Sequence, residues 1–203
     1  TIGLVPTRQR RITVEKCAIN AVMAGCRPEY LPVVTAILTA MLDPTFNFHG
    51  SVTSTGGSAQ LVVINGPIRD QLNLNSGVNL FGPGNWANAT IGRAVRLVLI
   101  NVCGAKPGVL DKATHGHGGK YSMVIAEDEE TSPWPALHVT RGFPVDTSTV
   151  TVFAAEAPHN VQDHKSTTGE GVLCSIAMEM ASAGSWSDGE SAVIVAPEHA
   201  RLL

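Results

Sequence analysis

Leu61-Val62-Val63-Ile64-Asn65-Gly66-Pro67-Ile68 is the stretch of this chain from which the fold is best predicted. Its first four residues form an unbroken apolar run, which is typical of a β-strand buried on both faces. The next four residues predict a turn directly after that strand. Ligands of open α/β sheets gather at the carboxyl ends of the strands, so Asn65 is a candidate site residue.

The remaining apolar runs predict an α/β fold with a mixed sheet covered by helices. β-rich runs predict three further strands, at 121–126, 149–153 and 192–196. Apolar residues at helical spacing predict helices at 14–22, 30–41, 86–103 and 172–180, and Gly25 should end the first of them. We expect a single α/β domain over 1–203, with an arm and a helical pair in 1–44 and a sheet-containing core in 45–203.

The composition narrows the class of protein. The chain has 203 residues, of which 44% are hydrophobic and 15% charged, so it can bury a sizeable core and is not a disordered tail. A net charge of −3 does not fit a nucleic-acid binder, and no apolar run is long enough for a membrane span. The four cysteines lack CxxC spacing, which argues against a zinc knuckle or a redox dithiol. We expect a cytoplasmic protein.

Segment 113–121 reads Ala-Thr-His-Gly-His-Gly-Gly-Lys-Tyr and is the strongest candidate site. Its polarity and its glycines predict a loop over a scaffold, where binding groups tend to lie. His115 and His117 are two residues apart and would point to one side of an extended segment. Lys120 adds a cation. The alternative is a surface turn without a function.

Carboxylates near this loop allow two kinds of chemistry. Five of the seven histidines fall between 115 and 164, and Glu127 and Glu156 each follow a predicted strand. With His115 and His117, such carboxylates could hold a divalent metal that has an open position for water. A metal-free pocket in which His159 and Glu127 do acid/base work is the alternative. Glu127 also begins an acidic run that could simply be solvated.

Segment 72–88 is rich in asparagine and glycine and leads into the predicted helix at 86–103. Free backbone N–H groups at such a helix start can hold an anion, which makes Asn88 and Arg93 candidate substrate-binding residues. The sequence matches neither a Walker loop nor a dinucleotide fingerprint, and the glycines could simply turn the chain.

Cys26 lies at the break between the two N-terminal helices. A thiol near a helix N-terminus has a lowered pKa and reacts readily, which predicts a nucleophile or redox group. The alternative is a cysteine that packs in a tight corner.

Several of these segments together resemble a bacterial family. The strings are Ala21-Val22-Met23-Ala24-Gly25-Cys26-Arg27-Pro28-Glu29-Tyr30, Asn65-Gly66-Pro67-Ile68, Ala87-Asn88-Ala89-Thr90-Ile91-Gly92-Arg93-Ala94, Thr114-His115-Gly116-His117-Gly118-Gly119-Lys120-Tyr121 and Ser132-Pro133-Trp134. They resemble a family whose members occur with, or fused to, proteins that carry a Sec/Cys-Gly-Ser-Cys motif, the UGSC-like group. The resemblance implies no particular activity, and the motif itself is absent here. The family pattern continues past Leu203, so we expect a chain truncated at its C-terminus.

The sequence therefore predicts an enzyme that acts on a small polar or anionic molecule by hydrolysis or lyase-type chemistry. The predicted catalytic residues are Cys26, His115, His117, Glu127 and His159, the substrate-binding residues are Asn65, Asn88, Arg93 and Lys120, and His115 and His117 are the metal-ligand candidates. One alternative is a thiol or redox subunit that uses Cys26 with a partner protein, and another is a non-catalytic subunit of a complex. We expect a homo-oligomer or a partner subunit, because long Asn/Gly-rich loops are costly to order alone.

Overall fold

The computed structural model describes residues 1–183 and 189–203. The chain forms two compact units. Unit 1 comprises Thr1–Glu127 and Leu137–Ala157, and unit 2 comprises Asp128–Ala136 and Pro158–Leu203. The predicted segment 1–44 and the sheet both belong to unit 1. The α/β class with a mixed sheet and a helical pair is confirmed.

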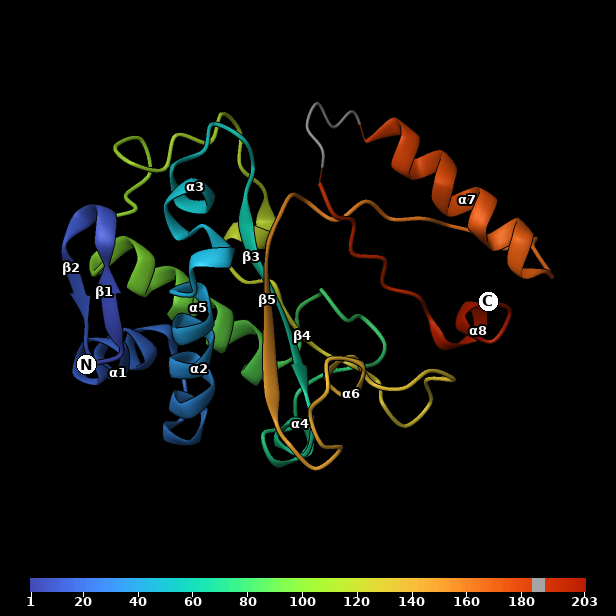
Figure 1. The fold of residues 1–203 in the computed structure, drawn as a ribbon, viewed down its shortest axis with the longest axis horizontal. Helices are drawn as coiled ribbons and strands as arrows, with labels where there is room; N and C mark the ends of the chain where they lie inside the picture. The colour runs from blue at the N-terminus through green and yellow to red at the C-terminus, as the bar shows by residue number, and fades with distance from the viewer. Residues whose placement is uncertain (184–188) are drawn as a thin grey trace. The chain divides into compact units, whose positions relative to one another are not determined.

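A three-stranded sheet with the order β4-β3-β5 forms the middle of unit 1 (Figure 1). The central strand β3 (Ala59–Asn65) runs parallel to β4 (Val124–Ala126) and antiparallel to β5 (Thr149–Ala155). Both faces of β3 are covered, which explains its unbroken apolar run. β4 is shorter than the predicted strand 121–126, because Tyr121 instead ends the 3-10 turn η4 (Gly118–Lys120) by donating its N–H to the Gly118 carbonyl.

Three long helices pack together in unit 1: α1 (Val14–Ala24), α2 (Leu31–Met41) and α5 (Trp86–Asn101). They share one hydrophobic core with the sheet face that carries Val62 and Ile64. α1 ends at Gly25 as predicted, since this residue adopts a left-handed φ of 87° and its N–H binds the last carbonyl groups of the helix.

Shorter elements complete unit 1. The arm predicted at the start of 1–44 is an antiparallel hairpin of β1 (Gly3–Val5) and β2 (Arg10–Ile12). The remaining pieces are η1 (Pro6–Arg8), η2 (Pro28–Tyr30), η3 (Pro44–Phe46), α3 (Phe48–Thr53), α4 (Ile68–Gln71) and α6 (Leu137–Thr140).

Unit 2 contains α7 (Gly169–Ser182), which includes the predicted helix 172–180, and the short α8 (Pro197–Ala200). The predicted strand 192–196 is wrong. This segment is in no strand, and it pairs with no strand in the described parts of the chain. Its Val193 and Ile194 stay about half exposed, because an apolar run forms a strand only where a neighbouring strand supplies hydrogen-bond partners.

No single helix within 1–183 or 189–203 combines the length and apolarity of a membrane span. One pair, Pro28–Met41 with Pro44–Thr53, does so only jointly and is bent by 75°.

Candidate functional site

A cavity of about 390 Å³ opens beside the His-Gly loop of unit 1. Its wall on α5 carries Arg93, Arg96 and Ile100. The other residues come from the segment after α5 and from the loop itself: Pro107, Gly108, Asp111, Ala113, His115, Gly116, His117, Lys120 and Tyr121. The predicted candidates His115, His117, Arg93 and Lys120 therefore line one cavity.

Asp111 lies at the centre of the charged groups of this cavity. Its carboxylate binds the Arg96 guanidinium, and the Lys120 ammonium lies 3.0 Å from Oδ2 and 3.1 Å from Oδ1. The Ala113 N–H also donates to Oδ1, at 3.2 Å. Burial raises the pKa of this carboxyl group, but the hydrogen bonds from Arg96, Lys120 and Ala113 outweigh it and hold the pKa below its usual value. Asp111 is thus a buried, ionised counter-ion.

The cavity has more positive than negative charge. Three permanent cations, Arg93, Arg96 and Lys120, line it against the single carboxylate of Asp111, which leaves an excess of two positive charges with the histidines neutral. Lys120 is held from a second side, because its ammonium also donates to the Ser58 carbonyl at 3.3 Å. Such an excess at a partly enclosed site attracts anions.

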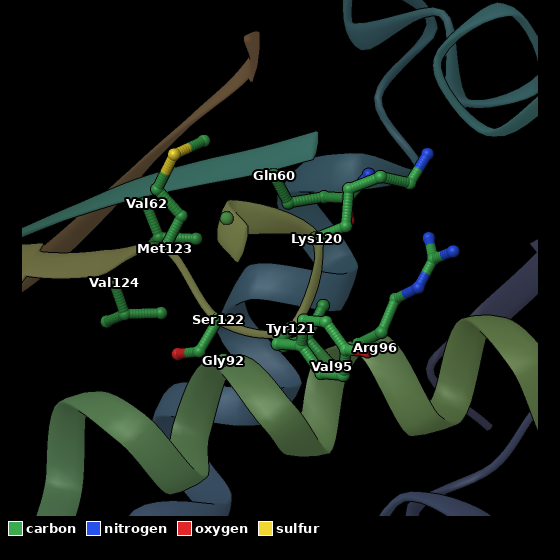
Figure 2. A pocket seen from close by; sticks show the side chains of 11 residues that line it. Gln60, Val62, Gly92, Val95, Arg96, Lys120, Tyr121, Ser122, Met123 and Val124 are labelled. Carbon is green, nitrogen blue, oxygen red and sulfur yellow. The ribbon is translucent and has the colours of Figure 1, made fainter. Parts of the chain in front are cut away.

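A small void of about 10 Å³, whose lining residues Figure 2 shows, adjoins the cavity at Lys120 and Tyr121. Arg96, Lys120 and Tyr121 line both spaces, so the two share a wall. The Gln60 side chain extends from β3 toward Lys120 in Figure 2. Gln60 is buried, and its Nε2 has no hydrogen-bond partner in the described parts of the chain. The void has room for about one water-sized group.

His117 has a structural role in this arrangement. Its Nδ1 accepts a hydrogen bond from the Gly119 N–H at 3.1 Å, which caps η4. Its Nε2 lies 2.6 Å from the Gly57 carbonyl, and these two bonds together assign the proton to Nε2. Both ring nitrogens are engaged by the backbone, which does not fit the predicted metal-ligand and catalytic roles of His117.

Glu156 belongs to the same neighbourhood, because its Oε2 accepts the Gly57 N–H at 3.0 Å. A Cβ atom on Gly57 would lie 2.6 Å from that oxygen and 3.1 Å from the His117 ring, so a larger residue would have to displace the Glu156 carboxylate or the His117 ring. Glu156 and His117 therefore bind one glycine and not a shared ion. No group of three or more metal-ligating side chains occurs within 1–183 and 189–203, so the described donor set does not fit the predicted divalent metal.

His115 differs from His117. It is exposed, it lines the cavity, and its ring makes no hydrogen bond within the parts of the chain that the structure describes. Both of its nitrogens can contact a bound molecule, and imidazole is a common general acid or base in proteins. His115 is therefore the residue of this cavity best suited to acid/base chemistry.

Asn65 and Glu127 form a second polar group, at the carboxyl ends of β3 and β4. The Asn65 Nδ2 donates to Glu127 Oε2 at 2.5 Å, and the Leu137 N–H donates to the same oxygen at 2.8 Å. Arg69 binds the Glu127 carbonyl at 2.8 Å. The Glu127 side chain thus bonds to β3 and to the start of α6. Since β3 and β4 are parallel, this group lies at the opposite strand ends from the His-Gly loop, and Glu127 does not partner His115 as predicted.

The other predicted site residues are not among those that line the cavity. The half-buried Cys26 donates its S–H to the Thr90 carbonyl at 3.2 Å. Burial raises the pKa of this thiol more than that bond lowers it, so the predicted lowered pKa is wrong. Asn88 is buried and bonds to Asn75 and to the Val124 carbonyl, which links α5 to β4. His159 lies in unit 2, where its Nδ1 is 2.8 Å from Glu179.

Sequence reasoning did not name Arg96, Asp111 or Tyr121 as site residues, although Tyr121 ends the predicted site segment 113–121. Arg93 and Arg96 are three apart in α5 and so share a helix face, a spacing that could have identified Arg96. Nothing in the local sequence marks Asp111, whose partners come from α5 and η4.

The chain matches no protein-family model, no curated protein and no solved structure. The resemblance to the UGSC-associated family stays a prediction.

Proposed function

We propose that unit 1 is an enzyme that binds a small anionic molecule in this cavity and acts on it by hydrolysis or lyase-type chemistry. The observation that carries the proposal is the convergence of Arg93, Arg96 and Lys120 on one cavity with a single carboxylate. The Asp111 carboxylate holds Arg96 and Lys120 in place before a ligand arrives, which reduces the entropy lost on binding.

Each cavity residue has a distinct part in this proposal. Lys120 and Arg93 contact the anion directly, because Arg96 is buried and committed to Asp111. Lys120 keeps one donor hydrogen for an anion after its bonds to Asp111 and to the Ser58 carbonyl, since an ammonium group has three. His115 gives a proton to the leaving group or takes one from the attacking group, according to the reaction. His117 and Gly57 hold the loop in position.

Titration calorimetry with inorganic phosphate, sulfate and malonate tests the binding step. We expect at least one of these anions to bind, and Arg93→Met and Lys120→Met each to weaken it about tenfold or more. Lys106→Met is the matched control, because Lys106 is exposed and lies outside the cavity lining. Arg93→Met protects the test against misfolding, since Arg93 makes no ion pair within 1–183 and 189–203 and its guanidinium only lies over the Tyr121 ring.

The result that overturns the proposal is the absence of binding by all three anions at millimolar concentration. That outcome would favour the non-catalytic subunit over the enzyme.

A separate variant, His115→Gln, tests the proposed proton-transfer step. His115→Gln should keep the anion affinity within about twofold, yet abolish turnover of whichever small phosphate or carboxylate ester the chain converts.

A further inference from the structure

Tyr121 is the one Phe, Tyr or Trp residue among the described residues that line the cavity, and it is held in an exposed position. Its N–H binds the Gly118 carbonyl, which fixes the backbone at the end of η4. The Arg93 guanidinium lies 5.7 Å from the centroid of its ring, a cation–π distance. The side chain is nevertheless 68% exposed. A large aromatic side chain that is positioned but uncovered offers a ring surface to whatever enters the cavity.

The charge of the cavity distinguishes between classes of anion. The lining has two positive charges in excess, as described above. A phosphate monoester carries about −1.5 to −2 charges at pH 7 and offers three acceptor oxygens. A monocarboxylate carries a single charge. Guanidinium groups also bind phosphate through two parallel hydrogen bonds, a geometry available to Arg93.

The size of the cavity limits the organic part of the ligand. Its volume of about 390 Å³ lies near the lower end of the roughly 300–1,000 Å³ that is usual for small-molecule sites. One phosphate group and one ring system fit such a space, and a polynucleotide does not.

We infer that the ligand of this cavity is a phosphate monoester whose organic part is a flat aromatic ring, with the ring packed on Tyr121 and the phosphate bound by Arg93 and Lys120. This inference rests on the proposed function and specifies its substrate class. Tyr121 is then a specificity-determining residue, since it contacts the part of the ligand that carries no charge.

Calorimetry with phenyl phosphate, ethyl phosphate and benzoate tests the inference. We expect phenyl phosphate to bind roughly five- to tenfold tighter than ethyl phosphate, which lacks the ring. It should also bind at least about tenfold tighter than benzoate, which has the ring but one charge. Tyr121→Ala should remove the preference, so that phenyl phosphate and ethyl phosphate bind to this variant with equal affinity. Tyr121→Phe should keep the preference.

Phe81→Ala is the matched control, because Phe81 is an exposed aromatic residue of unit 1 outside the cavity lining. Two results overturn the inference: equal affinities for phenyl and ethyl phosphate, or a preference that survives in Tyr121→Ala. Benzoate that binds as tightly as phenyl phosphate would overturn the phosphate assignment. In each case inorganic anions would still bind, so the proposed function would stand. Loss of all anion binding would overturn both.

Discussion

Replacing Asp111 by asparagine tests the electrostatic arrangement of the cavity. Asp111 is 5% exposed and Arg96 is 6% exposed, so their ion pair is nearly out of contact with water. Asp111→Asn keeps the size of the side chain and removes its charge. The Arg96 guanidinium would then be buried without a carboxylate, and Lys120 would lose its ionic partner.

Removing one partner of a buried ion pair costs about 3–5 kcal/mol of stability. The asparagine carbonyl can still accept the Ala113 N–H, so we expect the low end of that range, about 3 kcal/mol. Hydrogen exchange of the buried β3 amides measures this loss, because these amides report on unit 1 alone. Asp70→Asn is the control, and this exposed position should change stability by no more than about 0.5 kcal/mol.

The same variant predicts a pH dependence. The folded-state pKa of Asp111 lies below the unfolded value of about 3.9. The stability that its ionised form contributes is therefore fully present above that value, and it is lost as the pH falls through the lower folded pKa. The difference between the native chain and Asp111→Asn should shrink below about pH 4. A loss below about 1 kcal/mol at pH 7, or a difference that stays constant down to pH 2, would refute this account of the cavity.

Two further predictions concern packing and thiol reactivity. Gly92→Ala should destabilise unit 1 by about 1–3 kcal/mol in urea unfolding. The reason is that the new Cβ would lie 2.9 Å from the Ser122 Cβ and 3.0 Å from its Cα. An unchanged urea midpoint would contradict the close contact between α5 and Ser122. Iodoacetamide at pH 7 should label the exposed Cys174 faster than each of the other three cysteines. Burial raises the pKa of Cys17 to about 11 and that of Cys103 to about 12, and it also raises the pKa of Cys26. Peptide mapping that finds Cys26 labelled first would restore it as a reactive thiol.

The parts of the fold that the sequence predicted correctly are those with a local cause. β3 is buried on both faces, and four consecutive apolar residues reveal that without knowledge of its neighbours. Gly25 ends α1 because few other residues adopt its left-handed φ. The run at 192–196 looks equally strand-like, but a strand needs hydrogen bonds from a segment far away in the sequence. Local composition does not contain that information.

The candidate site divides in the same way. The polarity and glycine content of 113–121 located the loop, and with it His115 and Lys120. The partnership of Arg96 with Asp111 arises only when the segment after α5 folds back on the helix, and the two residues are fifteen apart. His117 looked like a ligand from its type and spacing. Its backbone partners Gly57 and Gly119 show that the same residue type serves equally well to hold a loop.

The parallel pairing of β3 with β4 explains why the predicted residues separate into two groups. Segments that enter two parallel strands meet at one edge of the sheet, and segments that leave them meet at the other. Ser58 and Lys120 both precede their strands and are joined by a hydrogen bond, whereas Asn65 and Glu127 both end or follow theirs and are joined by another. The rule that ligands bind at the carboxyl ends of strands favours the second group. The cationic side chains lie with the first, because the face of α5 with Arg93 and Arg96 lines the cavity there. We therefore expect an anion at the edge where these arginines lie, and not at the edge that the direction of the strands favours.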